Sequence, residues 1–219
     1  MRAPVKRQYD ASGRQARAQE TRRAVLRAAH DLFVEHGYGR TTVGDIARDA
    51  GVSVETVYAA FRNKATLLHR VWDVTIGGDD ADVVYHERPE IRAMRDEPDL
   101  ARRLDMQARL FTGTARRIVP FLLAVQGAAA SEPAAAELLK EIGRQRLAGI
   151  SVMASAAAST GQLAVSEEEC RDVIWAFTDG MLWHRLVEQR GWTDEAFAGW
   201  LGQMWVRTLV RPEPGPRKS

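Results

Sequence analysis

The sequence has 219 residues, of which 45% are hydrophobic and 27% charged, and this composition excludes disorder of the whole chain. Its one cysteine, Cys170, cannot form an internal disulfide, and the acidic residues before it oppose a reactive thiolate. The longest uncharged stretches are too short or too polar to span a bilayer, and no apolar run follows the basic N-terminus. We therefore expect a cytoplasmic protein without a signal peptide.

The net charge of +2 is unevenly distributed along the chain. Residues 1–70 contain 13 Lys and Arg against 7 Asp and Glu, a net charge of +6, whereas residues 71–219 contain 18 against 22, a net charge of −4. A basic N-terminal third on a mildly acidic remainder is typical of a protein whose first third approaches a polyanion. A solvated basic arm is the alternative interpretation.

Helical spacing of apolar residues recurs along the chain, and no strand-like alternation persists, so we predict an all-α fold. The predicted organisation is an N-terminal three-helix DNA-binding domain followed by a larger helical domain. We divide the chain into a flexible basic arm at 1–14, a helix-turn-helix domain at 15–70, a helical ligand-binding and dimerisation domain at 71–211, and a disordered tail at 212–219.

The first four helices are predicted at 17–36, 43–50, 54–60 and from residue 64 onward. Thr42 and Asp45 form a capping-box pattern at the start of the second helix. Ser53 and Asn63 are the expected N-caps of the next two helices, and Gly51 supplies a left-handed turn between two short helices. This arrangement of short helix, tight turn and short helix is typical of a helix-turn-helix.

The run FVEHGYGRTTVGDIARDAGVSVETVYAAFRNKATLLHRVW, within residues 17–72, resembles the DNA-binding domain of the TetR (tetracycline repressor) family of transcriptional regulators. The resemblance rests on many residue types at fixed offsets, including Gly37-Tyr38, Thr41-Thr42-Val43 and Thr56-Val57-Tyr58. Beyond residue 72 only the helical layout is similar. The resemblance implies that Thr42, Tyr58 and Lys64 contact phosphate.

The third helix has an unusual outer face for a DNA reader, because it carries neither arginine nor asparagine between Val54 and Ala60. Val54 and Ala59 suit contact with thymine methyl groups in a major groove. Glu55 either accepts from a cytosine amino group or only stabilises the positive end of the helix dipole. Tyr58 and Lys64 have structural alternatives, as a packed ring and a solvated charge. The residues predicted to contact DNA are Thr42, Gly44, Val54, Glu55, Thr56, Tyr58, Ala59 and Lys64.

The remaining helices are predicted at 64–76, 89–96, 99–118, 120–130, 132–159, 166–189 and 194–210, with Gly77-Gly78 ending the first of them. The last two helices are apolar on two faces, so one face is expected to be buried in a second copy of the chain, or otherwise in a monomeric core. The residues predicted at this dimer interface are Val173, Phe177, Met181, Phe197, Trp200, Leu201, Met204 and Trp205.

A ligand pocket is predicted among the helices of residues 99–187, with plain core packing as the alternative role of its candidate residues. These candidates are Met106, Phe111, Phe121, Met153, Trp175, Phe177 and Trp183. The five histidines show no metal-ligand spacing, and no catalytic, phosphate-loop or dinucleotide motif is present, so we expect no metal, no cofactor and no enzyme.

These patterns predict a homodimeric one-component transcriptional regulator, most simply a repressor, that binds a palindromic DNA operator. A small apolar or amphipathic effector would release the operator. The alternative is a helical small-molecule binding or interaction protein that has lost specific DNA binding.

Overall fold

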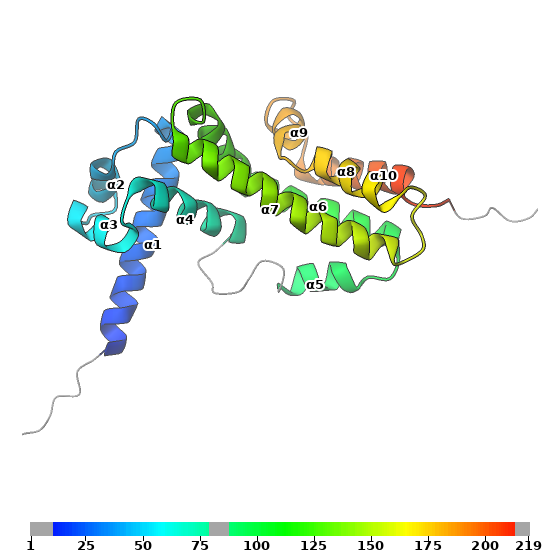
Figure 1. Cartoon of the computed structure of the whole chain (residues 1–219), viewed down its shortest axis with the longest axis horizontal. Helices are drawn as coiled ribbons and strands as arrows, with labels where there is room; N and C mark the ends of the chain where they lie inside the picture. Colours follow the sequence, from blue (N-terminus) through cyan, green and yellow to red (C-terminus); the bar gives the residue numbers. More distant parts are fainter. Residues whose placement is uncertain (1–10, 79–87, 213–219) are drawn as a thin grey trace, which may run out of the picture.

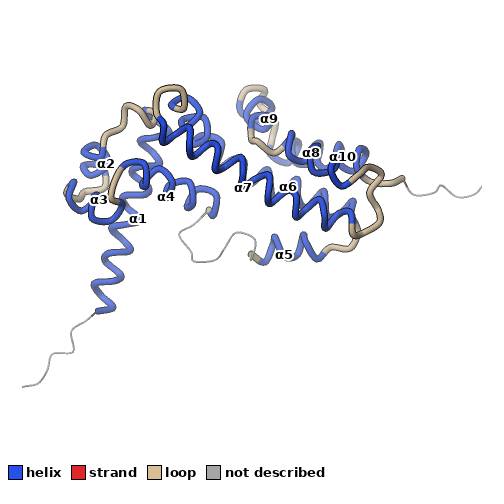
Figure 2. Tube along the Cα trace, in the orientation of Figure 1, coloured by secondary structure: helices blue, strands red, loops and turns tan. Residues whose placement is uncertain are grey.

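The computed structural model describes residues 11–78 and 88–212, and these residues form helices joined by short turns, with no strand beyond one isolated antiparallel bridge between Leu163 and Val210 (Figures 1 and 2). The predicted all-α fold is confirmed, with a small N-terminal helix-turn-helix domain and a larger helical domain behind it. The predicted arm at 1–10 and tail at 213–219 lie outside the described residues.

The N-terminal domain consists of α1 (Ala11–His36), α2 (Val43–Asp49), α3 (Val54–Phe61) and α4 (Lys64–Gly77). α1 begins six residues before the predicted start at Arg17, so the residues from Ala11 to Arg14, which we expected in a flexible arm, are helical. α4 ends where Gly77-Gly78 predicted, because Gly78 adopts the left-handed conformation at φ +82° and its N–H donates to the Val74 carbonyl at 2.9 Å.

The C-terminal domain contains α5 (Pro89–Asp96), α6 (Leu100–Ala128), α7 (Pro133–Ala158), α8 (Glu167–Phe177), α9 (Met181–Trp183) and α10 (Asp194–Leu209). A π-helical turn, His184–Glu188, continues α9. α6 runs through the middle of the domain and packs against α10 along one side and against α7 along another (Figure 1). It also reaches α1 and α4, and so it joins the two domains.

Two predicted helix boundaries in this domain are wrong. The helices expected at 99–118 and 120–130 form the single helix α6, with Pro120 inside it. Proline removes one backbone hydrogen bond, but buried side chains on both sides of it, Val119 and Phe121 among them, hold the helix continuous.

The second wrong boundary lies in the helix expected at 166–189, which is interrupted at residues 178–180. Gly180 adopts φ +88°, and a Cβ at this position would lie 2.7 Å from Cγ2 of Val119. Glycine therefore permits a turn that brings α9 against α6, which a continuous helix would not allow.

The contact between the two domains is aromatic. The Phe121 ring of α6 is fully buried and lies 6.0 Å from the His30 ring, 6.5 Å from that of Phe33 and 6.4 Å from that of Trp72, measured between ring centroids. Arg117, one turn earlier on α6, donates to the carbonyl of Ile76 at 3.4 Å in the last turn of α4. α6 is thus in contact with both long helices of the N-terminal domain.

Candidate nucleic-acid interface

The second helix of the N-terminal domain is fixed at its start by a reciprocal pair of hydrogen bonds. The Asp45 N–H donates to Oγ1 of Thr42 at 3.1 Å, and the Thr42 N–H donates to Oδ2 of Asp45 at 3.0 Å, so the predicted capping box is confirmed. The Thr42 hydroxyl also donates to Asp45 at 2.6 Å. These bonds, together with Arg48, lower the pKa of Asp45 to about 2. These bonds therefore fix the start of α2 at Thr42.

The helix α3 is oriented by its own cap and by two buried side chains. The Thr56 N–H donates to Oγ of Ser53 at 3.2 Å, which confirms Ser53 as the N-cap. Val57 and Phe61 are 2% exposed and point into the core. The opposite face must then point to solvent, because α3 has the 3.6-residue period of an α-helix.

The five predicted DNA-contacting residues of α3 lie on that outer face. Val54 is 37% exposed and Tyr58 49% exposed, and the other three are also exposed: Glu55, Thr56 and Ala59. The Thr56 hydroxyl lies 3.0 Å from that of Ser53, so it takes part in the cap. Figure 1 shows α3 at the edge of the molecule, remote from the C-terminal domain.

Glu55 is held by its own backbone. Hydrogen bonding to its own N–H, and then to the Ser53 hydroxyl, lowers the pKa of the Glu55 carboxyl. The carboxylate therefore remains ionised near the positive end of the α3 dipole, which is the structural alternative for this residue.

Thr42 and Gly44 are both exposed at the start of α2. Lys64, by contrast, is only half-exposed, and its ammonium group donates to the Tyr38 carbonyl at 2.5 Å. The same Nζ lies 4.0 Å from the centroid of the Tyr38 ring. Burial lowers the pKa of Lys64, and the charge of Glu132 partly opposes that effect. Lys64 therefore differs from the solvated charge that was the structural alternative to its predicted phosphate contact.

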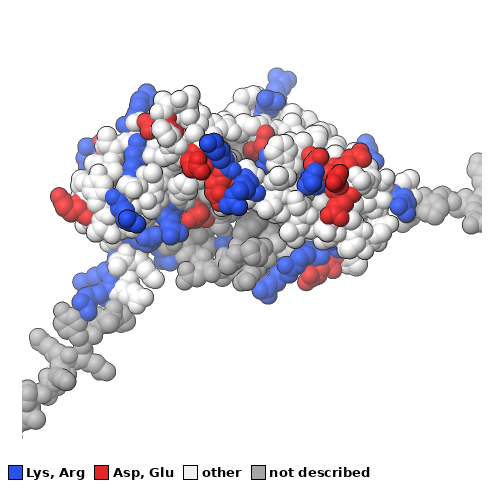
Figure 3. Space-filling view, in the orientation of Figure 1, with Lys and Arg blue, Asp and Glu red and all other residues white. Residues whose placement is uncertain are grey.

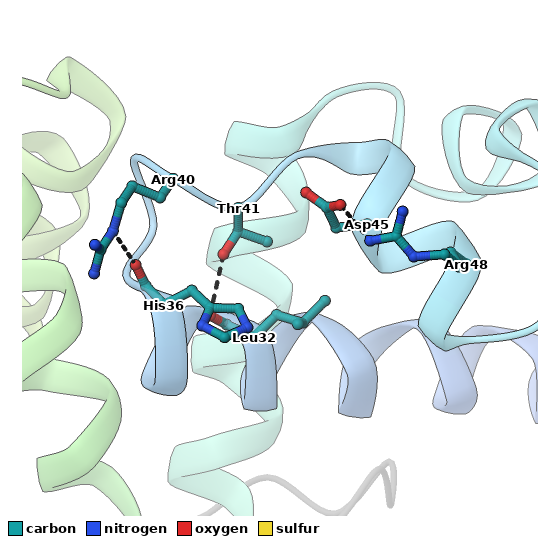
Figure 4. Close-up of a pocket in the computed structure, with 6 residues that line it drawn as sticks. All are labelled: Leu32, His36, Arg40, Thr41, Asp45 and Arg48. Atoms are coloured by element: carbon teal, nitrogen blue, oxygen red, sulfur yellow. Dashed lines mark hydrogen bonds and ion pairs between the residues drawn. The ribbon is translucent and has the colours of Figure 1, made fainter.

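Three arginines near this surface were missed by the sequence analysis. Arg22 of α1 donates to the carbonyl of Ala60 at 3.4 Å and lies over the Phe61 ring, so it supports the end of α3. Arg40 and Arg48 line a hollow of about 340 Å³ between α1 and α2, together with Leu32, His36, Thr41 and Asp45 (Figure 4). Arg40 immediately precedes the Thr41-Thr42 pair, so its position in the sequence could have identified it as a residue of this surface.

Charge is distributed on the surface as the sequence predicted. On the face shown in Figure 3, basic side chains gather along α1 and beside it, whereas acidic and basic side chains lie next to one another over α7. The first turn of α8 alone carries Glu167, Glu168 and Glu169. A polyanion would therefore approach the N-terminal domain more readily than it would approach α8.

The seven candidate ligand-binding residues are not gathered around either of the two hollows described for this chain, one beside α2 and one on α10. Phe121 belongs to the contact between the domains, and Trp183 is 3% exposed and donates to Oδ1 of Asp194 at 2.9 Å. Phe121 and Trp183 are therefore buried core residues and no longer candidates for the ligand pocket. Trp175 is exposed and lies under the guanidinium of Arg146, with 4.6 Å between that group and the ring centroid.

The other candidates, Met106, Phe111, Met153 and Phe177, are half-buried. Gln107, which the sequence analysis missed, is a buried amide on α6 that donates to the Met153 sulfur at 3.4 Å. A thioether is a weak acceptor, so this amide has capacity for a stronger partner.

The predicted dimer residues divide into two groups. Phe197, Leu201 and Trp205 are fully buried within one chain, because they lie on the face of α10 that packs against α6. These three have no surface to offer a partner, and the prediction is wrong for them. The exposed or half-exposed residues of the set are Val173, Phe177, Met181, Trp200 and Met204.

Within the described ranges, no three His, Cys, Asp or Glu side chains are grouped so that they could hold a metal ion. A search of the same ranges finds no helix that is both long and apolar enough to cross a membrane.

Residues 25–71 match the family described as bacterial regulatory proteins, tetR family. Over 56 residues the chain is 45% identical to the HTH-type transcriptional regulator TtgR of Pseudomonas putida, an alignment that covers 26% of this chain and 27% of TtgR. The chain thus matches about a quarter of the length of such curated relatives.

Two solved structures share the fold over most of the chain. A transcriptional regulator from Saccharomonospora viridis in complex with choline has a TM-score of 0.67 at 19% identity, covering 89% of this chain and 100% of that one. NalD, the secondary repressor of the MexAB-OprM multidrug efflux pump in Pseudomonas aeruginosa, has a TM-score of 0.63 at 22% identity, covering 89% and 98%. The helix-turn-helix segment, residues 25–71, is thus similar to the tetR family of bacterial regulatory proteins, and over the rest of the chain the solved structures share the fold.

Proposed function

We propose that the chain is a one-component transcriptional regulator that represses its target genes as a homodimer bound to a palindromic DNA operator. The observation that carries this proposal is the outer face of α3, which is exposed on a helix fixed by the Ser53 cap and by a buried pair, Val57 and Phe61. This face lies within the segment that matches the family. The protein would act in the cytoplasm.

The chemistry of α3 favours an operator read through thymine methyl groups and DNA shape. Val54 and Ala59 offer small apolar groups suited to such contacts. Tyr58 offers an exposed hydroxyl to a phosphate, as do Thr42 and the N–H of Gly44 at the start of α2. Glu55 repels phosphate, which lowers general affinity for DNA and so increases discrimination.

Two copies are needed because a single module of this size buries too little surface for selective binding. We propose that the copies associate through the outer faces of α8 and α10, where Trp200 is 37% exposed beside Met204. An open hollow of about 550 Å³ lies on the same face of α10, between Trp192 and Trp200. Exposed aromatic side chains of this kind are common at the centre of protein interfaces.

The Trp200→Glu variant tests this surface. It is expected to sediment as a monomer in analytical ultracentrifugation and to lose operator binding, because a charge would be buried between the two copies. Val152→Glu, which places the same charge at an exposed apolar position on α7, is the matched control and should remain dimeric. A dimeric Trp200→Glu variant would place the interface elsewhere.

We propose that residues 15–70 bind DNA and that residues 71–211 bind a small apolar or amphipathic effector between α6, α7 and α8. The choline complex and the efflux-pump repressor with the same fold support this assignment. Met106, Phe111, Met153, Trp175 and Phe177 remain the proposed lining, with the Gln107 amide as a polar partner. The effector acts only if it binds one conformation more tightly than the other.

A mobility-shift titration with the DNA that flanks the protein's own gene tests the proposed function. About eight phosphate contacts per dimer predict a log–log salt slope near −7, together with a clear preference over random DNA. Salt-sensitive binding without preference would indicate a non-specific DNA-binding protein. No shift at all would favour a helical small-molecule binding protein that has lost DNA recognition.

A further inference from the structure

The corner between α6 and α7 carries a carboxylate that is directed at the N-terminal domain. Glu132 is the N-cap residue of α7, yet its side chain makes no capping hydrogen bond to that helix. Oε1 of Glu132 instead lies 3.3 Å from the position that a Cβ on Gly39 would occupy. Gly39 belongs to the turn after α1, and Figure 1 shows this turn beside the α6–α7 corner.

The same carboxylate acts on Lys64 and Tyr38. Burial raises the pKa of Tyr38 and Glu132 raises it further, and Glu132 also opposes the effect of burial on Lys64. Lys64 therefore lies in the electrostatic field of Glu132, which belongs to the C-terminal domain.

The orientation of Lys64 conflicts with its proposed contact to DNA. Its ammonium is turned back onto the Tyr38 carbonyl at 2.5 Å and onto the Tyr38 ring, at a half-exposed position on the first turn of α4. A phosphate and a carboxylate attract the same ammonium by the same charge-assisted interaction. Holding Lys64 near Glu132 therefore weakens its contact with a phosphate.

We propose that Glu132 is an internal competitor of the DNA backbone for Lys64. While the α6–α7 corner lies against the turn after α1, Lys64 is bonded to the Tyr38 carbonyl, the Glu132 carboxylate lies beside that turn, and affinity for DNA is reduced. Withdrawal of the corner releases Lys64 to a phosphate and raises affinity without any change in α3. This inference rests on the proposed DNA binding and on the phosphate contact that the family resemblance implies for Lys64.

The test compares Glu132→Gln with the wild-type protein on a fluorescein-labelled mixed-sequence DNA duplex, measured by anisotropy over a range of salt concentrations. The variant should bind about two- to fivefold more tightly, the range expected for removal of one partly exposed opposing charge. Its log–log salt slope should become steeper by about 1 for each subunit, because one more phosphate contact forms. Glu137→Gln is the matched control, since it removes the same charge on α7 from a residue that pairs with Lys140.

Lys64→Ala and the double variant Lys64→Ala, Glu132→Gln separate the possible failures. The inference predicts that the gain from Glu132→Gln disappears when Lys64 is absent. Equal affinity of Glu132→Gln and Glu137→Gln, or a gain that persists without Lys64, would overturn it while leaving DNA binding intact. If neither the wild type nor any variant binds the duplex, the proposed function fails and the inference fails with it. Glu132→Asp, which keeps the charge, should bind as the wild type does.

Discussion

Helices in both domains start at local side-chain caps, but in the C-terminal domain more arginines donate to carbonyls of other helices. α2, α3 and α4 each start at a side chain that accepts from an N–H three residues later: Thr42, Ser53 and Asn63. In the C-terminal domain α6, α8 and α10 start in the same way, at Asp99, Ser166 and Thr193, and arginines add bonds between helices. Arg146 of α7 donates to the Trp175 carbonyl at the end of α8 at 2.5 Å, and Arg103 of α6 donates to the Ala156 carbonyl of α7 at 3.1 Å.

These two kinds of hydrogen bond differ in whether they depend on the relative positions of the helices. Caps between residues three apart do not depend on contacts with the rest of the chain, so they keep the short helices α2 and α3 rigid. Arginine-to-carbonyl bonds between elements hold only while those elements keep their positions. The C-terminal helices are therefore coupled to one another, which suits a domain that responds to a ligand.

The largest predicted effect is at the contact that joins the two regions. Phe121→Ala should lower the free energy of unfolding by about 3–5 kcal/mol, because it leaves a cavity among the three rings that surround Phe121. Urea denaturation followed by circular dichroism measures this loss. Phe111→Ala, at a half-buried position on the same helix, should cost clearly less. Equal costs would mean that Phe121 is not the main link between the domains.

The second prediction concerns the break between α8 and α9. Gly180→Ala should destabilise the protein by about 2–3 kcal/mol, from the positive φ and from the 2.7 Å approach to Val119. Gly149→Ala is the control, because this helical glycine has open space around its Cβ position, and it should stabilise by about 0.5–1 kcal/mol. Chemical denaturation of the two variants measures both changes in the free energy of unfolding. A neutral Gly180→Ala would show that the break does not depend on glycine.

The third prediction tests whether the N-terminal helices depend on local caps. Thr42→Ala removes the N-cap of α2 and should cost about 1 kcal/mol in thermal or urea unfolding. Thr42→Ser keeps a hydroxyl at the same place and should retain most of the stability. If both variants behave like the wild type, α2 is held by packing alone.

The smallest predicted effect is a pH dependence at the same cap. The folded state lowers the pKa of Asp45 from 3.8 to about 2, so its contribution is present above the unfolded value and is lost as the pH falls through about 2. The difference in melting temperature between the wild type and Asp45→Asn should therefore be present at neutral pH and should shrink between about pH 4 and pH 2. Asp49→Asn removes a charge from the end of α2 without touching the cap and should show no such change in this interval.

The sequence predicted the N-terminal domain well because its signals are local. A hydroxyl or amide three residues before its partner marks the start of each short helix, and the inward pair Val57 and Phe61 fixes the outer face of α3. The side-chain partner of Lys64 could not be predicted, because Tyr38 is 26 residues away and Glu132 lies in the other domain.

The C-terminal domain was harder to predict because its boundaries depend on contacts between distant residues. Pro120 suggested a helix end, but burial on both sides of it keeps α6 continuous. Gly180 resembled an ordinary helix residue in the sequence, and only its approach to Val119 explains the break. The two apolar faces of α10 were identified, but the face that packs on α6, with Trp205, could not be distinguished from the outer one, with Trp200.

Ala59 and Ala60, on the outer face of α3, have a consequence for evolution. Both side chains are exposed, and neither belongs to the buried core. Replacing a residue of this kind changes stability by about 0.5 kcal/mol or less, so larger or polar side chains can be accepted there without loss of the fold. If α3 reads DNA as we propose, its sequence preference can change by single substitutions, while the need to fold constrains the buried side of the same helix.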